Sequence, residues 1–452
     1  MERQLIIGVV ALTAIGGLSL AAPDAGAAFA VVLFPSLIAL GLFRHYSEDK
    51  EFITKIFIGG LLVRLAFGLF VQIFELREFF GGDANTYDQR GLMLLDQWLG
   101  NAIYLDPVTA SNMAGLGSGW GMYYLVASLY AIVGRNILAA QSLCAVFGAA
   151  IAPLVYFCAH RLFQNERVAK TSAFLAAFFP AFIIWSGQLL KDGLIVFFLV
   201  LAMTMVLSLQ EKFKYGSLIV LFVSIGAILT LRFYIFYMLG IAVVGSFIVG
   251  FSKSGQALAR NTAVLVMLGL AMTYFGITRN ATVNFEKYGS LERVQGSRGD
   301  LVRSAKSGFG EDIDVSTTSG AISAIPVGFV YLMFAPFPWE VSTLRASIPL
   351  PEVLVWWAMM PLLVYGLWFT IKTRLRAAFP ILIFSLMLTL AYSIFQGNVG
   401  TAYRQRTQIQ VFLFMFIAVG WQLYQEKKED KKLLARARQR RLEHALQARL
   451  RS

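Results

Sequence analysis

Residues 53–90 read ITKIFIGGLLVRLAFGLFVQIFELREFFGGDANTYDQR, an apolar run followed at once by a polar stretch. The run from Ile53 to Phe74 can cross a bilayer as one helix, because roughly 20 apolar residues span the hydrocarbon core. The polar stretch begins with two glycines and carries two carboxylates, Asp83 and Asp88. This part of the chain therefore predicts a membrane helix that delivers acidic side chains to one membrane surface.

The composition of the whole chain extends this pattern. Of the 452 residues, 58% are hydrophobic and 14% are charged, whereas soluble domains carry roughly 25% charged residues. Apolar runs of membrane-spanning length recur from end to end. We expect an all-α polytopic membrane protein with about 12 transmembrane helices, whose external loops carry interfacial helices.

Basic loops set the expected orientation, because loops rich in Lys and Arg stay on the cytoplasmic side. Expected spans are 5–20, 27–43, 53–74, 137–157, 168–184, 194–209, 217–231, 235–251, 262–277, 353–371, 378–395 and 409–424. Both termini are then cytoplasmic, and Asp83 is external. This holds only if 120–133 and 322–339 do not cross, and we expect both to be interfacial or re-entrant.

The runs and loops divide the chain into five segments. These are an N-terminal helix hairpin (1–52), a transmembrane core (53–278) with a first loop at 75–136, a large external loop with a re-entrant segment (279–352), C-terminal transmembrane helices (353–425) and a basic tail (426–452). The tail holds ten Lys or Arg against four acidic residues. It is typical of a cytoplasmic helix that contacts anionic membrane lipids.

The net charge of +13 lies in short loops and in the tail rather than on a compact domain, so we expect no nucleic-acid partner. Cys144 and Cys158 fall inside one apolar run and are expected to be core residues. Arg64 lies within the span at 53–74. A charge at that depth is costly unless it finds a partner.

The expected topology gathers charged side chains on the external face. They are Asp83, Asp88, Lys191, Asp192, Arg232, Arg404 and Arg406. A carboxylate can act as a general base on a hydroxyl group or hold a divalent cation. Arg and Lys can bind a phosphate and stabilise the charge that it develops as a leaving group. The set suits transfer from a lipid phosphate whose head lies at this interface.

Each of these residues also has a structural alternative. Asp83 follows two glycines and could cap a helix beginning at Ala84. Asp88 could pair with Arg90, and Lys191 with Asp192 could begin a helix. The three external arginines could anchor helix ends to lipid headgroups.

Several motifs together resemble a known superfamily. In order, they are Gly81-Gly-Asp-Ala-Asn-Thr-Tyr-Asp88, the apolar stretch 120–133, His160-Arg-Leu-Phe163, Pro180-Ala-Phe-Ile-Ile-Trp-Ser186 and Lys191-Asp-Gly193. This arrangement is similar to the integral-membrane GT-C glycosyltransferases, which include protein mannosyltransferases and lipid A aminoarabinose transferases. The chain differs from several members in having one Asp in place of an adjacent acidic pair and two helices before the loop-bearing helix.

The resemblance implies a GT-C-like fold and residue roles. The essential acid of the first external loop falls on Asp83, with Asp88 beside it as a second catalytic candidate. Asp192 falls where some members carry another acidic site, and the segment with Arg404 and Arg406 is similar to a late Arg-containing loop. The donor is then a polyprenyl-phosphate sugar, and the reaction inverts the anomeric centre.

On this interpretation, substrate or donor phosphate is held by Lys191, Asp192, Arg232, Arg404, Arg406 and Tyr87. If a divalent cation such as Mg²⁺ or Mn²⁺ takes part, Asp83 and Asp192 are its candidate ligands. The acceptor is expected to be a lipid-linked or surface glycan. The membrane is expected to be the inner membrane of a bacterium, with the site on its outer face.

Two other functions remain open. A polysaccharide polymerase or ligase also has about twelve helices and an Arg-bearing external loop, and here Arg293 and Arg298 lie in such a loop. A flippase for lipid-linked sugars would use the charged groups for binding only. That function predicts charges deep within the helices, where Arg64 is nearly alone.

Overall fold

The structure is a computed structural model that describes residues 23–80, 82–101, 107, 110–111, 115, 117–249, 255–303, 307–341 and 343–450. The secondary-structure elements of these residues are helices, which confirms the predicted all-α polytopic class. The expected first span, residues 5–20, lies outside the described residues.

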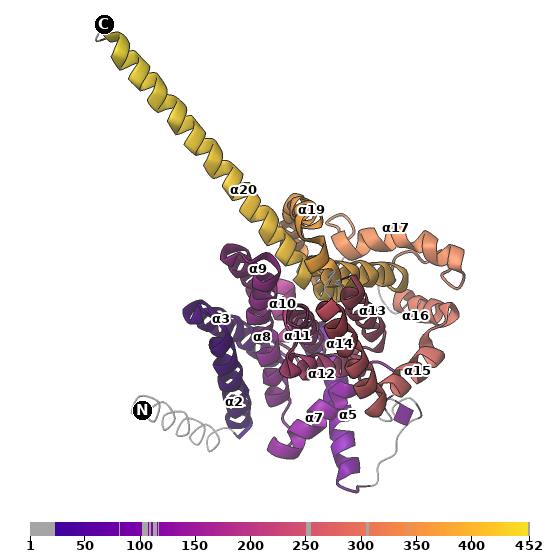
Figure 1. Cartoon of the computed structure of the whole chain (residues 1–452). Helices are drawn as coiled ribbons and strands as arrows, with labels where there is room; N and C mark the ends of the chain where they lie inside the picture. The colour runs from indigo at the N-terminus through magenta and orange to yellow at the C-terminus, as the bar shows by residue number, and fades with distance from the viewer. Residues whose placement is uncertain are drawn as a thin grey trace, which may run out of the picture.

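Figure 1 shows the arrangement of the described helices. They are α2 (Pro23–Tyr46), α3 (Lys50–Ile73), α4 (Arg77–Phe80), α5 (Asp83–Trp98), α7 (Trp120–Val133), α8 (Ile137–Phe163), α9 (Glu166–Phe178), α10 (Pro180–Ser186), α11 (Asp192–Glu211), α12 (Tyr215–Leu231), α13 (Phe233–Val249), α14 (Gly255–Tyr274), α15 (Ile277–Tyr288), α16 (Leu291–Arg303), α17 (Thr318–Phe334), α18 (Leu344–Ser347), α19 (Leu350–Phe395) and α20 (Val399–Leu450).

Span lengths agree only in part with the expected twelve crossings. Among the described residues, 6 helices are long and apolar enough to cross a membrane, or up to 8 if each bent pair forms one span. Shorter apolar helices are α7, α12, α13 and α17; α17 begins at Thr318 and covers residues 322–334 of the segment expected at 322–339. The number of crossings stays a prediction.

A break divides the expected span 168–184 into α9 and α10, which meet at 52°. Pro180 causes it, because proline has no N–H for the carbonyl four residues earlier, that of Ala176. Arg64 supplies the missing donors: Nη2 lies 3.3 Å from the Ala176 oxygen, and Nη1 lies 2.8 Å from that of Ala177. Its Nε also donates to Ser186 Oγ at 2.8 Å. The buried arginine therefore ties α3 to both sides of the break.

The two expected spans 353–371 and 378–395 are joined end to end as α19. Only Arg374 leaves helical geometry, with φ −137° and ψ 25°. Its guanidinium donates to the Leu162 carbonyl at 3.1 Å, near the end of α8. The basic loop predicted between these spans is thus a kink anchored to another helix.

The long helix α8 lies at the centre of the packing and contacts α2, α3, α9 and α11. Many of its buried residues are Ala or Gly, and small side chains let membrane helices approach closely. Cys144 and Cys158 are free and buried in it, as expected.

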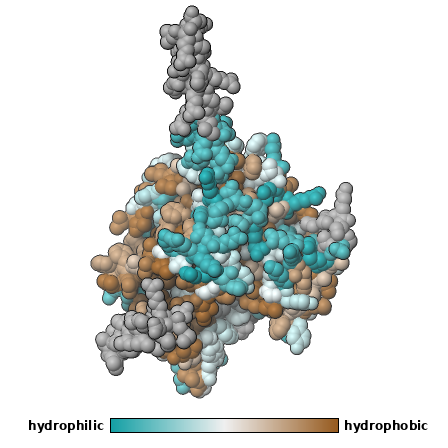
Figure 2. All heavy atoms as spheres, turned by 60° about the vertical axis from the view of Figure 1, so that its left-hand side comes forward, coloured by the Kyte–Doolittle hydropathy of each residue, from teal (hydrophilic) through white to brown (hydrophobic). Residues whose placement is uncertain are grey.

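The last helix, α20, leaves the body and projects to the C-terminus (Figure 1). Figure 2 shows hydrophilic surface at the base of this projection and hydrophobic surface on the flanks of the body. Such flanks suit a lipid environment. The start of α20 is buried instead, and it carries the residues considered next.

Candidate functional site

A cavity of about 1010 Å³ lies where several helix ends converge. Its lining comes from six regions: the start of α5 with the preceding Phe80, the end of α10 and the α10–α11 connection, the α12–α13 junction, the end of α16 with the residues after it, the stretch from α17 to the start of α19, and the start of α20. Asp83, Tyr87, Lys191, Arg232 and Arg404 all line it, although they are far apart in the sequence. The topology drawn from basic loops predicted that these residues share one membrane face, and the structure brings them together.

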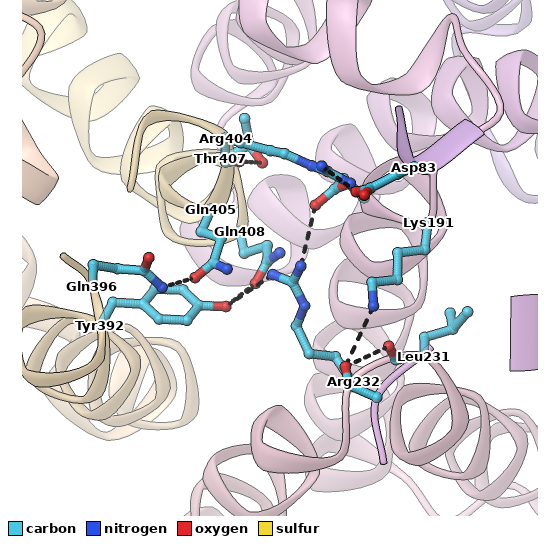
Figure 3. Close-up of polar contacts among 12 residues, drawn as sticks. Asp83, Lys191, Leu231, Arg232, Tyr392, Gln396, Arg404, Gln405, Thr407 and Gln408 are labelled. Carbon is cyan, nitrogen blue, oxygen red and sulfur yellow. Dashed lines mark hydrogen bonds and ion pairs between the residues drawn. The ribbon is translucent and has the colours of Figure 1, made fainter. Parts of the chain in front are cut away.

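Arg404 joins two carboxylates in this cavity (Figure 3). Its Nη1 lies 2.6 Å from Asp83 Oδ2. Its Nε and Nη2 lie 2.7 and 2.5 Å from Asp192 Oδ2. Charge-assisted contacts of this length are the strong class of hydrogen bond. The start of α20 is therefore fixed against α5 and α11.

The two carboxylates differ in exposure. The Asp83 side chain is 51% exposed, whereas that of Asp192 is 1% exposed. Asp192 Oδ1 also lies 3.7 Å from Arg232 Nη2, so one buried acid stands between two guanidinium groups. Asp192 is placed to orient these cations, and Asp83 is the acid that a substrate can reach.

Arg232 lies between α12 and α13 and is held from a second side. Its Nη1 lies 3.5 Å from Tyr392 Oη, and this hydroxyl donates to Gln408 Oε1 at 2.5 Å (Figure 3). Tyr392 and Gln408 were not among the predicted site residues. Nothing in the sequence marks them, because their role depends on α19 and α20 packing side by side.

Lys191 is 8% exposed and reaches Ser118 Oγ at 3.3 Å. Burial, together with the neighbouring Arg232, lowers the pKa of Lys191 to about 7. Gly119 makes room for it: this residue has φ +94°, and a Cβ there would lie 2.6 Å from Lys191 Nζ. Gly119, just before α7, was not among the predicted site residues, yet it makes room for a cavity lysine.

Aromatic rings form part of the wall. The Arg404 guanidinium lies 5.5 Å from the centre of the Trp185 ring, within range of a cation–π contact. Tyr87 is 5% exposed and packs on Tyr123, with ring centroids 5.8 Å apart. Trp185 was noticed in a motif but not predicted as a site residue.

Asp88 does not line this cavity. Its carboxylate accepts from Tyr130 Oη and Arg135 Nη2, both at 2.6 Å, rather than pairing with Arg90. Burial alone would raise the pKa of Asp88, but these hydrogen bonds hold it below its usual value. The structure therefore gives Asp88 a place joining α5 to α7 and to the start of α8, in contrast to its expected place beside Asp83.

Arg406 points away from the cavity as well. It is fully buried, and its Nη1 donates to the carbonyls of Met333 and Ala335 at 3.1 and 3.0 Å. The end of α17 is thereby tied to α20. A phosphate-binding role, expected from the sequence, does not follow from this position.

The donor set does not suit a divalent cation. Asp83 and Asp192, the two candidate ligands, both contact Arg404, and Lys191 and Arg232 add two more cations. Among the described residues, no group of three or more His, Cys, Asp or Glu side chains could hold a metal ion. Mg²⁺ prefers oxygen ligands without competing positive charge. The cluster fits an anion.

Residues 115–279 match the family described as dolichyl-phosphate-mannose-protein mannosyltransferase. The match contains Lys191, Asp192 and Arg232, and it confirms the expected resemblance to GT-C glycosyltransferases. No curated protein and no solved structure matches the chain.

Proposed function

We propose, from the family match and the cavity together, that this chain is a membrane glycosyltransferase. It takes a sugar from a polyprenyl-phosphate donor and passes it to a hydroxyl of a lipid-linked or surface glycan. The reaction takes place at the outer face of a bacterial inner membrane, and both termini are cytoplasmic. The observation that carries the proposal is the exposed carboxylate of Asp83 beside three cations, the buried Lys191 and Arg232 and the half-buried Arg404.

Asp83 is proposed as the general base. It accepts the proton of the acceptor hydroxyl while that oxygen attacks the anomeric carbon and the bond from this carbon to the phosphate oxygen breaks. Polyprenyl phosphate leaves with the electron pair, and the configuration at the anomeric carbon inverts. The leaving phosphate gains a negative charge during this step.

The three cations are proposed to stabilise that charge. Lys191, Arg232 and Arg404 lie at the same end of the cavity. Because the phosphate gains charge as the bond breaks, these cations bind the transition state more tightly than the donor. Apolar lining residues such as Phe80 and Ile184 suit the lipid part of the donor.

The test is a transfer assay with purified protein in nanodiscs, a panel of radiolabelled polyprenyl-phosphate sugars and glycan acceptors. Asp83→Asn is expected to lower the transfer rate at least ~100-fold, the lower range for loss of a general base. Asp96→Asn, an acid that does not line the cavity, is the matched control. Unchanged transfer by Asp83→Asn would contradict the proposed base.

The same assay with EDTA tests the role of metal. Because the cluster already pairs its carboxylates with cations, transfer is expected to continue at an unchanged rate after chelation. Loss of transfer with EDTA and its recovery with Mg²⁺ or Mn²⁺ would return Asp83 and Asp192 to the role of metal ligands.

The polymerase alternative required catalytic arginines in the external loop. Arg298 is 2% exposed, and it donates to the carbonyls of Ile394, Gln396 and Gly310 at 3.0 to 3.1 Å. These contacts hold the loop on the α19–α20 connection. Loss of transfer by Arg293→Ala, in a protein that keeps its melting temperature, would favour the polymerase.

A further inference from the structure

The cavity has a second end that differs in chemistry from the charged cluster. Its lining there includes Ser307, Tyr331, Glu340 and Asn398, here called the far end. Asn398 caps α20, accepting from the Gly400 N–H at 2.8 Å. Arg404 follows six residues later on the same helix, so the two ends are separated by about 9 Å at a rise of 1.5 Å per residue.

Independent contacts join the far-end residues to one another. Ser307 Oγ lies 3.3 Å from Asn398 Oδ1. The Tyr331 ring stacks on Phe309, with centroids 4.2 Å apart and planes at 2°. The Tyr331 hydroxyl donates to Glu340 Oε1 at 3.0 Å. Three segments of the chain therefore meet at one place, beside the cavity.

This place is held by Arg298. Besides its contacts to the α19–α20 connection, its guanidinium lies 5.9 Å from the centre of the Phe309 ring. The Phe309 N–H donates to the Gly397 carbonyl at 2.8 Å. The far end is thus a supported wall, and the buried arginine of the external loop acts as its positioning residue.

We propose that the far end binds the acceptor, and that the acceptor is a carbohydrate. The inference rests on the proposed function, since it assumes that the donor phosphate occupies the charged cluster. These side chains suit a sugar. The face of an aromatic ring can cover the C–H bonds of the sugar ring. A carboxylate, an amide and a hydroxyl group can form hydrogen bonds with the hydroxyl groups of the sugar. Among the described lining residues outside the charged cluster, Arg345 is the single cation, so a second phosphate lacks a comparable group of cations there.

The size of the cavity agrees with two ligands. Ligand pockets commonly measure roughly 300 to 1,000 Å³, and this cavity has about 1010 Å³. A sugar-phosphate head at the charged cluster leaves room for an acceptor sugar toward Asn398. Asp83 lies beside Arg404 at the charged cluster and lines the same cavity as Asn398.

Acceptor kinetics test the subsite. Glu340→Gln and Tyr331→Phe keep the side-chain shapes and remove one charge and one hydroxyl. Each is expected to raise the KM for a soluble acceptor, methyl α-mannoside or methyl β-glucoside, about tenfold, the usual effect of losing a hydrogen bond to a charged group. The donor KM and the slow donor hydrolysis without acceptor are expected to stay within twofold. Glu311→Gln, an exposed acid of the same loop that does not line the cavity, is the matched control.

Two results would overturn the inference; the first leaves the proposed function intact, and the second keeps its donor and its chemistry but replaces its glycan acceptor. One is an acceptor KM within twofold of the wild type for both variants. The other is transfer to a Ser/Thr-containing peptide and to none of the sugars. If the wild type transfers to nothing, the proposed function fails. Saturation-transfer NMR with methyl α-mannoside then tests the subsite alone, and a signal that Glu340→Gln does not reduce contradicts it.

Discussion

Lys191 combines a positive charge with nearly complete burial, and this makes its charge sensitive to pH. A lysine in water titrates near 10.4, but burial lowers the pKa of Lys191 to about 7. The amine is therefore protonated below about pH 7 and becomes neutral above it. In the proposed function only the charged form pairs with the donor phosphate, so donor binding is expected to depend on the fraction of Lys191 that is protonated.

The donor KM of the wild type is accordingly expected to rise about tenfold from pH 6 to pH 8.5, the effect of losing one charge-assisted contact. Lys191→Arg keeps its charge over this range and is expected to give a donor KM that hardly changes with pH. Initial rates at several donor concentrations provide the measurement. Parallel pH profiles for the two proteins would assign the titration to another group.

Among single residues, Asp83, Lys191, Arg232 and Arg404 could be selected from the sequence, because charge at the end of an apolar run is rare and the topology assigns it to one face. The different surroundings of Asp83 and Asp192 could not be predicted from the sequence. Both follow apolar runs, and only the packing of α20 shows that one is covered by arginine side chains and the other is exposed.

Among the elements, the break between α9 and α10 depends on Arg64. Replacing Arg64 with Ala leaves the carbonyls of Ala176 and Ala177 without their donors inside a low-dielectric environment. Arg64→Ala is expected to destabilise the protein by about 3 kcal/mol, since several hydrogen bonds to a charged group are lost at once. Thermal unfolding in detergent measures the change.

The matched control is Arg303→Ala, because the Arg303 side chain is 73% exposed and pairs only with Asp300 among the described residues. An exposed pair of this kind contributes little to stability. Equal melting temperatures for the two variants would show that the arginine inside the membrane is not needed to support the break.

The positions of the long helices could be predicted from the hydropathy of the sequence, but the bends within them could not. The run 168–184 looked like one span because Pro180 is surrounded by apolar residues, and a proline can be tolerated in a membrane helix. Whether it kinks or breaks the helix depends on a donor from elsewhere, here Arg64 of α3. In the same way, the large external loop was predicted from the sequence, but the helices α15 and α16 in this part of the chain were not predicted.

For the whole molecule, the orientation in the membrane was inferred from basic loops. The position of the cavity can be compared with that orientation. Most of the charged residues predicted to be external converge, whereas Arg161 and Arg260, in loops that the expected spans place on the cytoplasmic side, lie beside Glu211 at another place. Convergence alone does not assign a side. The assignment therefore stays a prediction.

Cysteine labelling in intact cells measures it. In a background of Cys144→Ala and Cys158→Ala, Glu311→Cys is expected to react with a membrane-impermeant thiol reagent, and Lys212→Cys only after the membrane is opened. Both positions are exposed, so the reagent can reach them. The reverse pattern would place the cavity on the cytoplasmic face.

The bridge that Arg404 makes between Asp83 and Asp192 has a consequence for kinetic order. In the proposed function Asp83 is the base, and its Oδ2 lies 2.6 Å from Arg404 Nη1, so this oxygen is occupied before substrate binds. A donor phosphate at Arg404 competes with Asp83 for the same N–H groups and leaves the carboxylate free to accept a proton. Donor is thus expected to bind before acceptor, so that an unreactive donor analogue inhibits competitively against donor and a dead-end acceptor inhibits uncompetitively against it. An enzyme with this order keeps its base inactive until there is a sugar to transfer.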